Sequence, residues 1–120
     1  MRVGYAIITV ILIVISTSSV LAVTTEERQA LEDLYQSTNG DSWTDNTNWL
    51  SSNVSTWYGV TVENDRVTEI DLQDNNLVGQ LPVSIGDFDA LLHLDIRRNS
   101  ITGRIPSSVG NMTSMKYLYL

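Results

Sequence analysis

The hydrophobic and polar positions between Val67 and Met112 repeat along the chain with an offset of 24 residues. In both copies a short alternation of apolar and polar residues is followed by an asparagine, a glycine and a proline in the same order. The matched pairs are Val67/Leu91, Ile70/Leu94, Leu72/Ile96, Asn75/Asn99, Leu77/Ile101, Gly79/Gly103, Leu81/Ile105, Pro82/Pro106, Ile85/Val109, Gly86/Gly110 and Phe88/Met112. A third copy begins at Met115, with Leu118 and Leu120 at the matching positions. Self-similarity at such a period predicts a solenoid.

Each copy has the pattern of a strand followed by a bend and a short helical turn. The alternation predicts that Ile70 and Leu72 point inward while their neighbours point outward. The amide of Asn75 offers donors and an acceptor to backbone groups left open where the chain leaves the strand. Gly79 permits backbone angles that other residues resist. Pro82 favours an extended residue before it and a helical turn after it, so we expect this turn on the convex side.

The segment before the repeats has the pattern of an amphipathic helix. Residues 24–27 fit a capping box, in which the Thr24 hydroxyl and the Glu27 carboxylate satisfy opposite backbone amides. The segment ends at Asn39–Gly40, which tolerates a left-handed turn. The apolar face is made by Ala30, Leu31, Leu34 and Tyr35. A helix of about four turns is marginal alone, so we expect it to cover the open end of the solenoid.

All three tryptophans follow in a polar loop, at Trp43, Trp49 and Trp57. We interpret them as core, because each indole ring buries roughly 200 Å² while its N–H finds a partner. The alternative is a platform on which sugars stack. Residues 57–62 predict a strand, and a turn over residues 63–66 joins it to the first repeat as a hairpin.

Residues 1–22 have the composition of a secretory signal peptide. A positive start at Arg2 is followed by an apolar stretch over residues 3–15 and then by a polar Ser/Thr segment. We expect cleavage after Ala22. The alternative is an uncleaved anchor, because residues 3–23 carry no charge and are just long enough to span a bilayer. With both alternatives the rest of the chain enters the secretory pathway.

The complete pattern, Leu-x-x-Leu-x-Leu-x-x-Asn-x-Leu-x-Gly-x-Ile-Pro-x-x-Ile-Gly-x-Leu, resembles the plant-type leucine-rich repeat. Residues 67–120 carry the match, and the signature Trp57-Tyr58-Gly59-Val60 resembles the end of the N-terminal cap of such proteins. The resemblance implies an α/β solenoid, a leucine-rich-repeat horseshoe segment with parallel strands on the concave face and a helix and hairpin as its N-terminal cap. The expected division is signal peptide 1–22, cap 23–66, repeat 1 67–90, repeat 2 91–114 and the start of repeat 3 115–120.

The cap departs from the family at two positions. The resemblance places a cysteine two residues before Trp57 and another five residues after it, where this chain has Ser55 and Val62. The chain contains no cysteine, so it forms no disulfide and has no thiol chemistry. We expect the packing of the tryptophans to replace the missing bridge.

Stacking of the repeats places equivalent outward residues about 4.8 Å apart on the concave sheet, the surface that solenoids generally present to partners. The predicted ligand-binding residues on this face are Glu69, Asp71, Gln73, His93, Asp95, Arg97, Tyr117 and Tyr119. We also expect Asp74 and Arg98 to pair across strands, and Asp71 to lie beside Asp95 as a like-charge pair.

Composition and geometry exclude several classes of function. The 14 acidic residues exceed the 7 basic ones, so a nucleic-acid partner is not expected. Glu69, Asp71, His93 and Asp95 are residue types that bind divalent cations or transfer protons. However, an open sheet neither excludes water nor orients a substrate, and no nucleophile has a base at suitable spacing. We therefore expect no catalytic residue, no metal site and no cofactor.

Two sequons, at Asn53-Val-Ser55 and Asn111-Met-Thr113, predict N-glycosylation in a eukaryotic source. The leading hypothesis is a secreted or cell-surface recognition module that binds a protein, peptide or glycan on its concave sheet, as part of a receptor-like protein. The alternative is a structural, surface-coat or adhesion repeat protein without a discrete ligand.

The third repeat has only its strand before Leu120, which predicts an N-terminal piece of a longer protein. Membrane attachment would then come only from an uncleaved signal anchor or from a segment beyond Leu120. Leu118 and Leu120 at an uncapped end also predict self-association.

Overall fold

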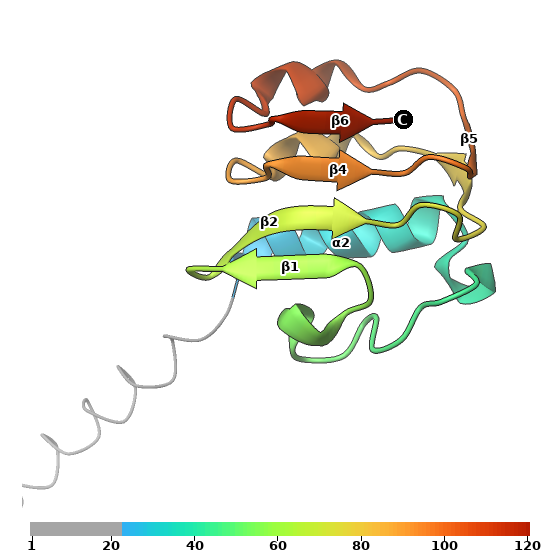
Figure 1. Cartoon of the computed structure of the whole chain (residues 1–120), viewed down its shortest axis with the longest axis horizontal. Coiled ribbons are helices and arrows are strands. Elements are labelled where there is room, and N and C mark those ends of the chain that lie inside the picture. The colour runs from blue at the N-terminus through green and yellow to red at the C-terminus, as the bar shows by residue number, and fades with distance from the viewer. Residues whose placement is uncertain (1–22) are drawn as a thin grey trace, which may run out of the picture.

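The computed structural model describes residues 23–120, so the predicted signal peptide and its cleavage site after Ala22 lie outside the described residues. The elements in chain order are α2 (Thr25–Ser37), the 3₁₀ helices η2 (Gly40–Ser42) and η3 (Val54–Thr56), β1 (Val60–Glu63), β2 (Arg66–Asp71), β3 (Val78–Gln80), η4 (Val83–Asp87), β4 (His93–Asp95), β5 (Ser100–Thr102), η5 (Ser107–Asn111) and β6 (Tyr117–Tyr119). Figure 1 shows β1, β2, β4 and β6 side by side, with α2, η4 and η5 behind them.

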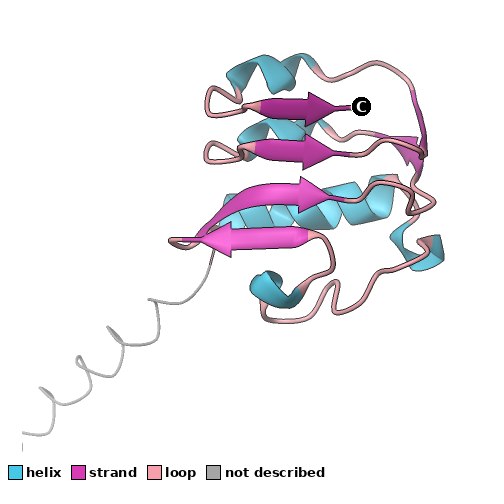
Figure 2. Ribbon diagram, viewed as in Figure 1, coloured by secondary structure: helices cyan, strands magenta, loops and turns pink. Residues whose placement is uncertain are grey.

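The main sheet has four strands in the order β1-β2-β4-β6. β2, β4 and β6 are parallel and in register, while β1 runs antiparallel to β2 as the predicted hairpin. After β2 and after β4 the chain crosses to the other side of the sheet, where η4 and η5 lie, as Figure 2 shows. The predicted solenoid with its helix and hairpin cap is therefore confirmed.

Helix α2 begins with half of the predicted capping box. The Thr24 hydroxyl accepts the backbone N–H of Glu27 at 3.2 Å. The other half is wrong, because the Glu27 carboxylate faces the sheet and accepts Nε–H of Arg66 at 2.7 Å and the backbone N–H of Val67 at 2.8 Å. The hairpin ladder shifts register beside Val67, and the carboxylate satisfies that amide. Glu27 thereby fastens the helix to the first strand.

The three tryptophans are buried in the cap, which confirms their interpretation as core. Trp49 lies between the other two rings, with centroid distances of 4.8 Å to Trp43 and 4.9 Å to Trp57. Their indole N–H groups donate to Thr38 O, Tyr58 O and Ser51 Oγ. The exposed fractions of 2–8% leave no ring face on which a sugar could stack, so the platform alternative is wrong.

The predicted asparagines form a ladder at the ends of the strands. Asn99 Oδ1 accepts the backbone N–H groups of Asn75 at 3.0 Å and Leu77 at 2.9 Å, while its Nδ2 donates to the carbonyls of Leu72 and Ile96. One repeat earlier, Asn75 makes the equivalent bonds to both backbone groups of Asp45 in the cap. The ladder thus joins cap, repeat 1 and repeat 2 at one edge.

A second sheet, which the sequence pattern did not predict, pairs β3 with β5 in parallel. Gly79 in β3 has φ +143°, and a Cβ there would collide with the carbonyl oxygen of Ser37. The glycine therefore serves the close approach of β3 to the end of α2. Strands of three residues are too short to be recognised by alternation alone.

We expect Glu27→Gln to lower the free energy of unfolding by about 2–3 kcal/mol, because Glu27 is fully buried and its charge is paired with Arg66. Chemical denaturation followed by circular dichroism measures the change. Glu26→Gln is the matched control, since Glu26 is exposed in the same turn. Equal stability of the two variants would contradict a fastening role for Glu27.

Candidate ligand-binding face

The predicted concave residues form columns across the parallel strands. Glu69, His93 and Tyr117 are in register, as are Asp71, Asp95 and Tyr119. The residues between them, Ile70 and Leu94, point to the opposite side and are buried. Gln73 and Arg97 follow the ends of β2 and β4 and are exposed. The structure therefore brings all eight predicted residues to one face of the sheet.

Asp95 differs from the expectation of an exposed carboxylate beside Asp71. Its exposed fraction is 1%, and Arg97 covers it through Nη2–Oδ2 at 2.6 Å and Nε–Oδ1 at 3.0 Å. The hydrogen bonds from Arg97 outweigh burial and hold the pKa of the Asp95 carboxyl below its usual range. The negative charge that Asp95 would place beside Asp71 is thus balanced by Arg97 in the same repeat. Asp95 is covered and holds the Arg97 side chain in position, so it does not itself face a ligand.

The expected pair between Asp74 and Arg98 is not formed. Within residues 23–120 no ion pair joins these side chains. Both residues have left-handed backbone angles, with φ 52° and 58°. They lie in the bend after each strand, where the chain leaves the sheet and cross-strand alternation no longer sets side-chain direction.

Two tyrosines on β6 form an exposed aromatic surface. Tyr117 and Tyr119 are 56% and 37% exposed, and their rings are nearly parallel with centroids 6.4 Å apart. The guanidinium of Arg97 lies 4.4 Å from the Tyr119 ring centroid. Such a cation–π contact orients both groups. Arg97 therefore contacts Tyr119 in the neighbouring repeat as well as Asp95 in its own.

His93 connects the acidic and aromatic parts of the face. Its Nδ1 lies 3.3 Å from Oε1 of Glu69. Its ring meets Tyr117 and Tyr119 edge-on, at centroid distances of 6.0 and 5.7 Å. Within residues 23–120, His93 Nε2 is the buried side-chain polar atom that lacks a hydrogen-bond partner. The tyrosines thus cover one polar atom that nothing satisfies.

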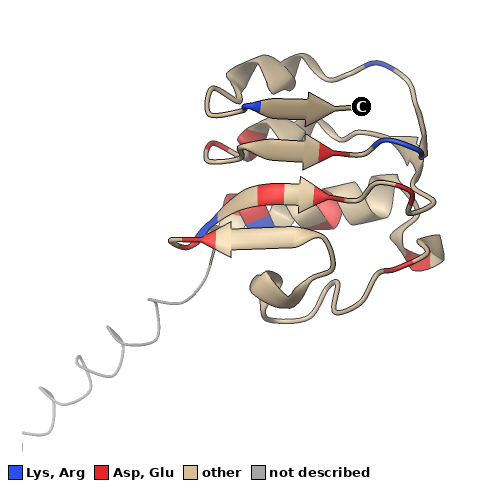
Figure 3. Ribbon diagram, in the orientation of Figure 1, with Lys and Arg blue, Asp and Glu red and all other residues tan. Residues whose placement is uncertain are grey.

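The charge of the face changes along the solenoid. Figure 3 shows acidic positions on β2 and the helix behind it and at the ends of β1 and β4, whereas β6 carries no acidic residue. In repeat 1, Glu69 and Asp71 are both partly exposed. In repeat 2 the Asp95 charge is matched by Arg97. The face therefore runs from an acidic end to an aromatic end.

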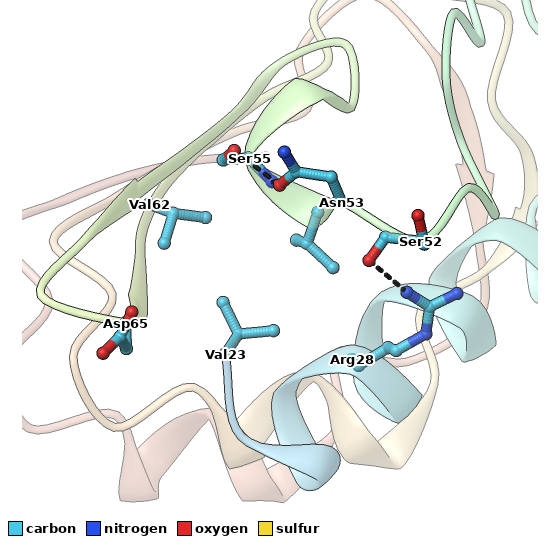
Figure 4. A pocket seen from close by; sticks show the side chains of 8 residues that line it. Val23, Arg28, Ser52, Asn53, Ser55, Val62 and Asp65 are labelled. Carbon is cyan, nitrogen blue, oxygen red and sulfur yellow. Dashed lines mark hydrogen bonds between the residues drawn. The ribbon is translucent and has the colours of Figure 1, made fainter. Parts of the chain in front are cut away.

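One hollow lies in the cap, away from this face. It has a volume of about 280 Å³ and is lined by Val23, Arg28, Ser52, Asn53, Val54, Ser55, Val62 and Asp65 (Figure 4). Arg28 is already committed, because its guanidinium donates to the carbonyls of Leu50, Ser51 and Ser52. Ser55 and Val62, where the resemblance to the family places cysteines, both line this space.

A second hollow of about 480 Å³ is more open and lies beside the start of α2 and the ends of η4 and η5. Its lining includes Glu26, Asp87, Asp89 and the sequon residue Asn111.

Among residues 23–120, no three His, Asp or Glu side chains are grouped closely enough to hold a metal ion. In the same range no helix has the length and apolar character needed to cross a membrane.

Both sequon asparagines are exposed and lie outside the concave columns. Asn53 caps η3, and its Oδ1 accepts from the backbone and hydroxyl of Ser55. Asn111 ends η5 on the side opposite to the main sheet. Glycans at these positions would leave the concave face open.

The family model described as Leucine Rich Repeat matches residues 66–88 and 90–112. The ectodomain of the receptor kinase SOBIR1 from Arabidopsis thaliana superimposes with a TM-score of 0.69 at 19% identity, over 83% of this chain and 55% of that one. The ectodomain of GASSHO1/SCHENGEN3 from the same plant gives a TM-score of 0.66 at 30% identity, over 81% and 12%. The BIR2 ectodomain, also from A. thaliana, gives 0.63 at 28% identity, over 82% and 55%.

These matches identify the chain as a leucine-rich-repeat protein related to plant leucine-rich-repeat ectodomains. It spans 55% of the length of the SOBIR1 and BIR2 ectodomains and 12% of that of GASSHO1/SCHENGEN3. No curated protein matches the sequence.

We expect Asp95→Asn to lower the free energy of unfolding at pH 7, because Arg97 loses its charged partner. The pKa of Asp95 is lowered in the folded protein, so its stabilising effect is present above the unfolded value of about 3.9 and is lost as the pH falls through the lower folded value. The stability difference between wild type and variant should therefore shrink below about pH 4.

Denaturant titrations at pH 7 and at successively lower pH values measure this difference. Asp87→Asn is the control, since Asp87 is exposed and lies outside the main sheet. A difference for Asp95→Asn that stays constant down to pH 2.5, or that matches the control, would contradict the pairing.

Proposed function

We propose that this protein is an extracellular recognition module that binds a protein or peptide on the concave face of its main sheet. The observation that supports it best is the exposed pair Tyr117 and Tyr119 beside Arg97. Tyrosine and arginine are enriched where proteins bind partners, and these side chains are already oriented by contacts with one another.

Two further observations support this proposal. The GASSHO1/SCHENGEN3 ectodomain, at 30% identity, was solved in complex with CASPARIAN STRIP INTEGRITY FACTOR 2. Secretion is favoured by the matched ectodomains and by the apolar, signal-like residues 1–22. In this proposal residues 23–66 form the cap, 67–90 and 91–114 form two repeats, and 115–120 begin a third. A receptor-like protein is the whole in which such a module would act.

The concave face is tested by selecting peptides from a random display library on the purified chain. We expect binders that lose at least about tenfold in affinity with Tyr117→Ser/Tyr119→Ser, because aromatic anchors carry much of the binding energy of an interface. Val78→Ser/Val83→Ser removes exposed apolar side chains outside the main sheet and is the control. Binders that depend on the control positions, or no binders at all, would favour a coat or adhesion protein without a discrete ligand.

We also expect Asn53 and Asn111 to carry glycans when the chain is secreted from eukaryotic cells, because both side chains are exposed. Each of Asn53→Gln and Asn111→Gln should remove one glycosidase-sensitive increment of mobility on a gel. Peptide binding should be unchanged by deglycosylation. A chain whose mobility does not respond to glycosidase would contradict the prediction.

A further inference from the structure

We propose that the concave face selects an extended peptide in which a lysine or arginine and an aromatic or large apolar residue lie about three positions apart. The basic residue lies over Glu69 and Asp71, and the apolar residue packs on Tyr117 and Tyr119. This inference rests on the proposed function and specifies its ligand class.

The acidic end supplies charge that the protein leaves largely uncompensated. Among the described contacts, Asp71 accepts one weak bond, from the backbone N–H of Gln73 at 3.3 Å. Glu69 is 40% exposed at its side chain, and within residues 23–120 it forms no ion pair with a lysine or arginine. Asp71 also lies close enough to Arg97 to contribute to the raised pKa of that guanidinium, although Asp95 is the main cause. A ligand cation would therefore meet two carboxylates held on one strand.

Repeat 2 attracts a ligand charge less than repeat 1 does. Asp95 and Arg97 neutralise each other through two hydrogen bonds, and Arg97 is further fixed on Tyr119. An acidic ligand that competed for Arg97 would have to break this arrangement and would also approach Glu69 and Asp71. The charge balance of the face thus favours a basic ligand over an acidic one.

The sheet geometry sets the spacing between the two ligand residues. β2 and β6 are separated by β4, so the carboxylates on β2 and the tyrosines on β6 are two strand spacings apart, about 10 Å. A peptide in the extended polyproline II conformation advances about 3.1 Å per residue with three residues per turn, so side chains three positions apart lie on the same face about 9 Å apart, which matches this separation when the peptide crosses the strands. The aromatic end accepts an apolar side chain, because the Tyr117 ring is more than half exposed.

The test reads the sequences of the peptides selected on the wild-type chain. We expect enrichment of Lys or Arg with an aromatic or large apolar residue two to four positions away. The best peptide is then titrated by fluorescence anisotropy against the wild type, Glu69→Gln/Asp71→Asn and Asp87→Asn/Asp89→Asn. The last variant removes the same charge from exposed positions off the sheet. Loss of about tenfold in affinity only in the Glu69/Asp71 variant, together with weaker wild-type binding at high salt, supports the proposal.

The outcomes separate the ligand class from the proposed function. Peptides that need Tyr117 and Tyr119 but lack basic residues would overturn the ligand class and leave the recognition function intact. An equal loss in both charge variants would overturn it too, because net charge alone would then explain binding. If no peptide is selected and binding on a glycan array depends on Tyr117, the ligand of the face would be a sugar and not a peptide. Absence of any sheet-dependent binder would overturn the recognition function itself.

Discussion

The structure depends on a single buried carboxylate at the junction of cap and repeats. A solenoid built from open repeats exposes an apolar end, and helix α2 covers that end through its apolar face. Apolar contact is not directional, so it does not by itself fix where a short helix lies. Glu27 supplies the direction, because it holds both Arg66 and the first amide of repeat 1 from a position with no exposed surface. The first parallel strand is placed by this contact.

From that strand onward, asparagines transmit the register. Asn75 satisfies two backbone groups of the cap, and Asn99 satisfies backbone groups of repeat 1 as well as of its own bend. Leaving such groups unpaired in the interior costs about 1–3 kcal/mol each, so a shifted repeat would lose several bonds together. The columns Glu69/His93/Tyr117 and Asp71/Asp95/Tyr119 follow from this ladder. The candidate binding face is therefore set by residues that do not belong to it.

The repeat pattern was sufficient to predict the strands of the main sheet, their inward and outward residues and the columns, because each depends on periodicity that two copies display. Contacts between residues far apart in sequence were not predictable in the same way. The capping-box pattern predicted that the Glu27 carboxylate bonds to a backbone amide at the start of its own helix. In the folded protein the carboxylate instead accepts hydrogen bonds from Arg66 and from the backbone N–H of Val67. Likewise, Asp95 looked exposed by alternation, although Arg97, two residues later, folds back over it. Register is encoded locally, and side-chain pairing is decided by the neighbours that folding brings.

The concave face is a better candidate than the deeper hollow in the cap for a physical reason. The cap hollow is lined by groups that already have partners, above all Arg28, which is bound to three backbone carbonyls and lies over Trp57. Binding there would displace existing bonds and gain little. On the sheet, by contrast, Tyr117 is exposed, and Glu69 and Asp71 are partly exposed. A partner that covers these groups removes apolar surface from water while leaving the Asp95–Arg97 support intact. The shallow surface therefore has more exposed side chains available for contact with a ligand than the hollow has.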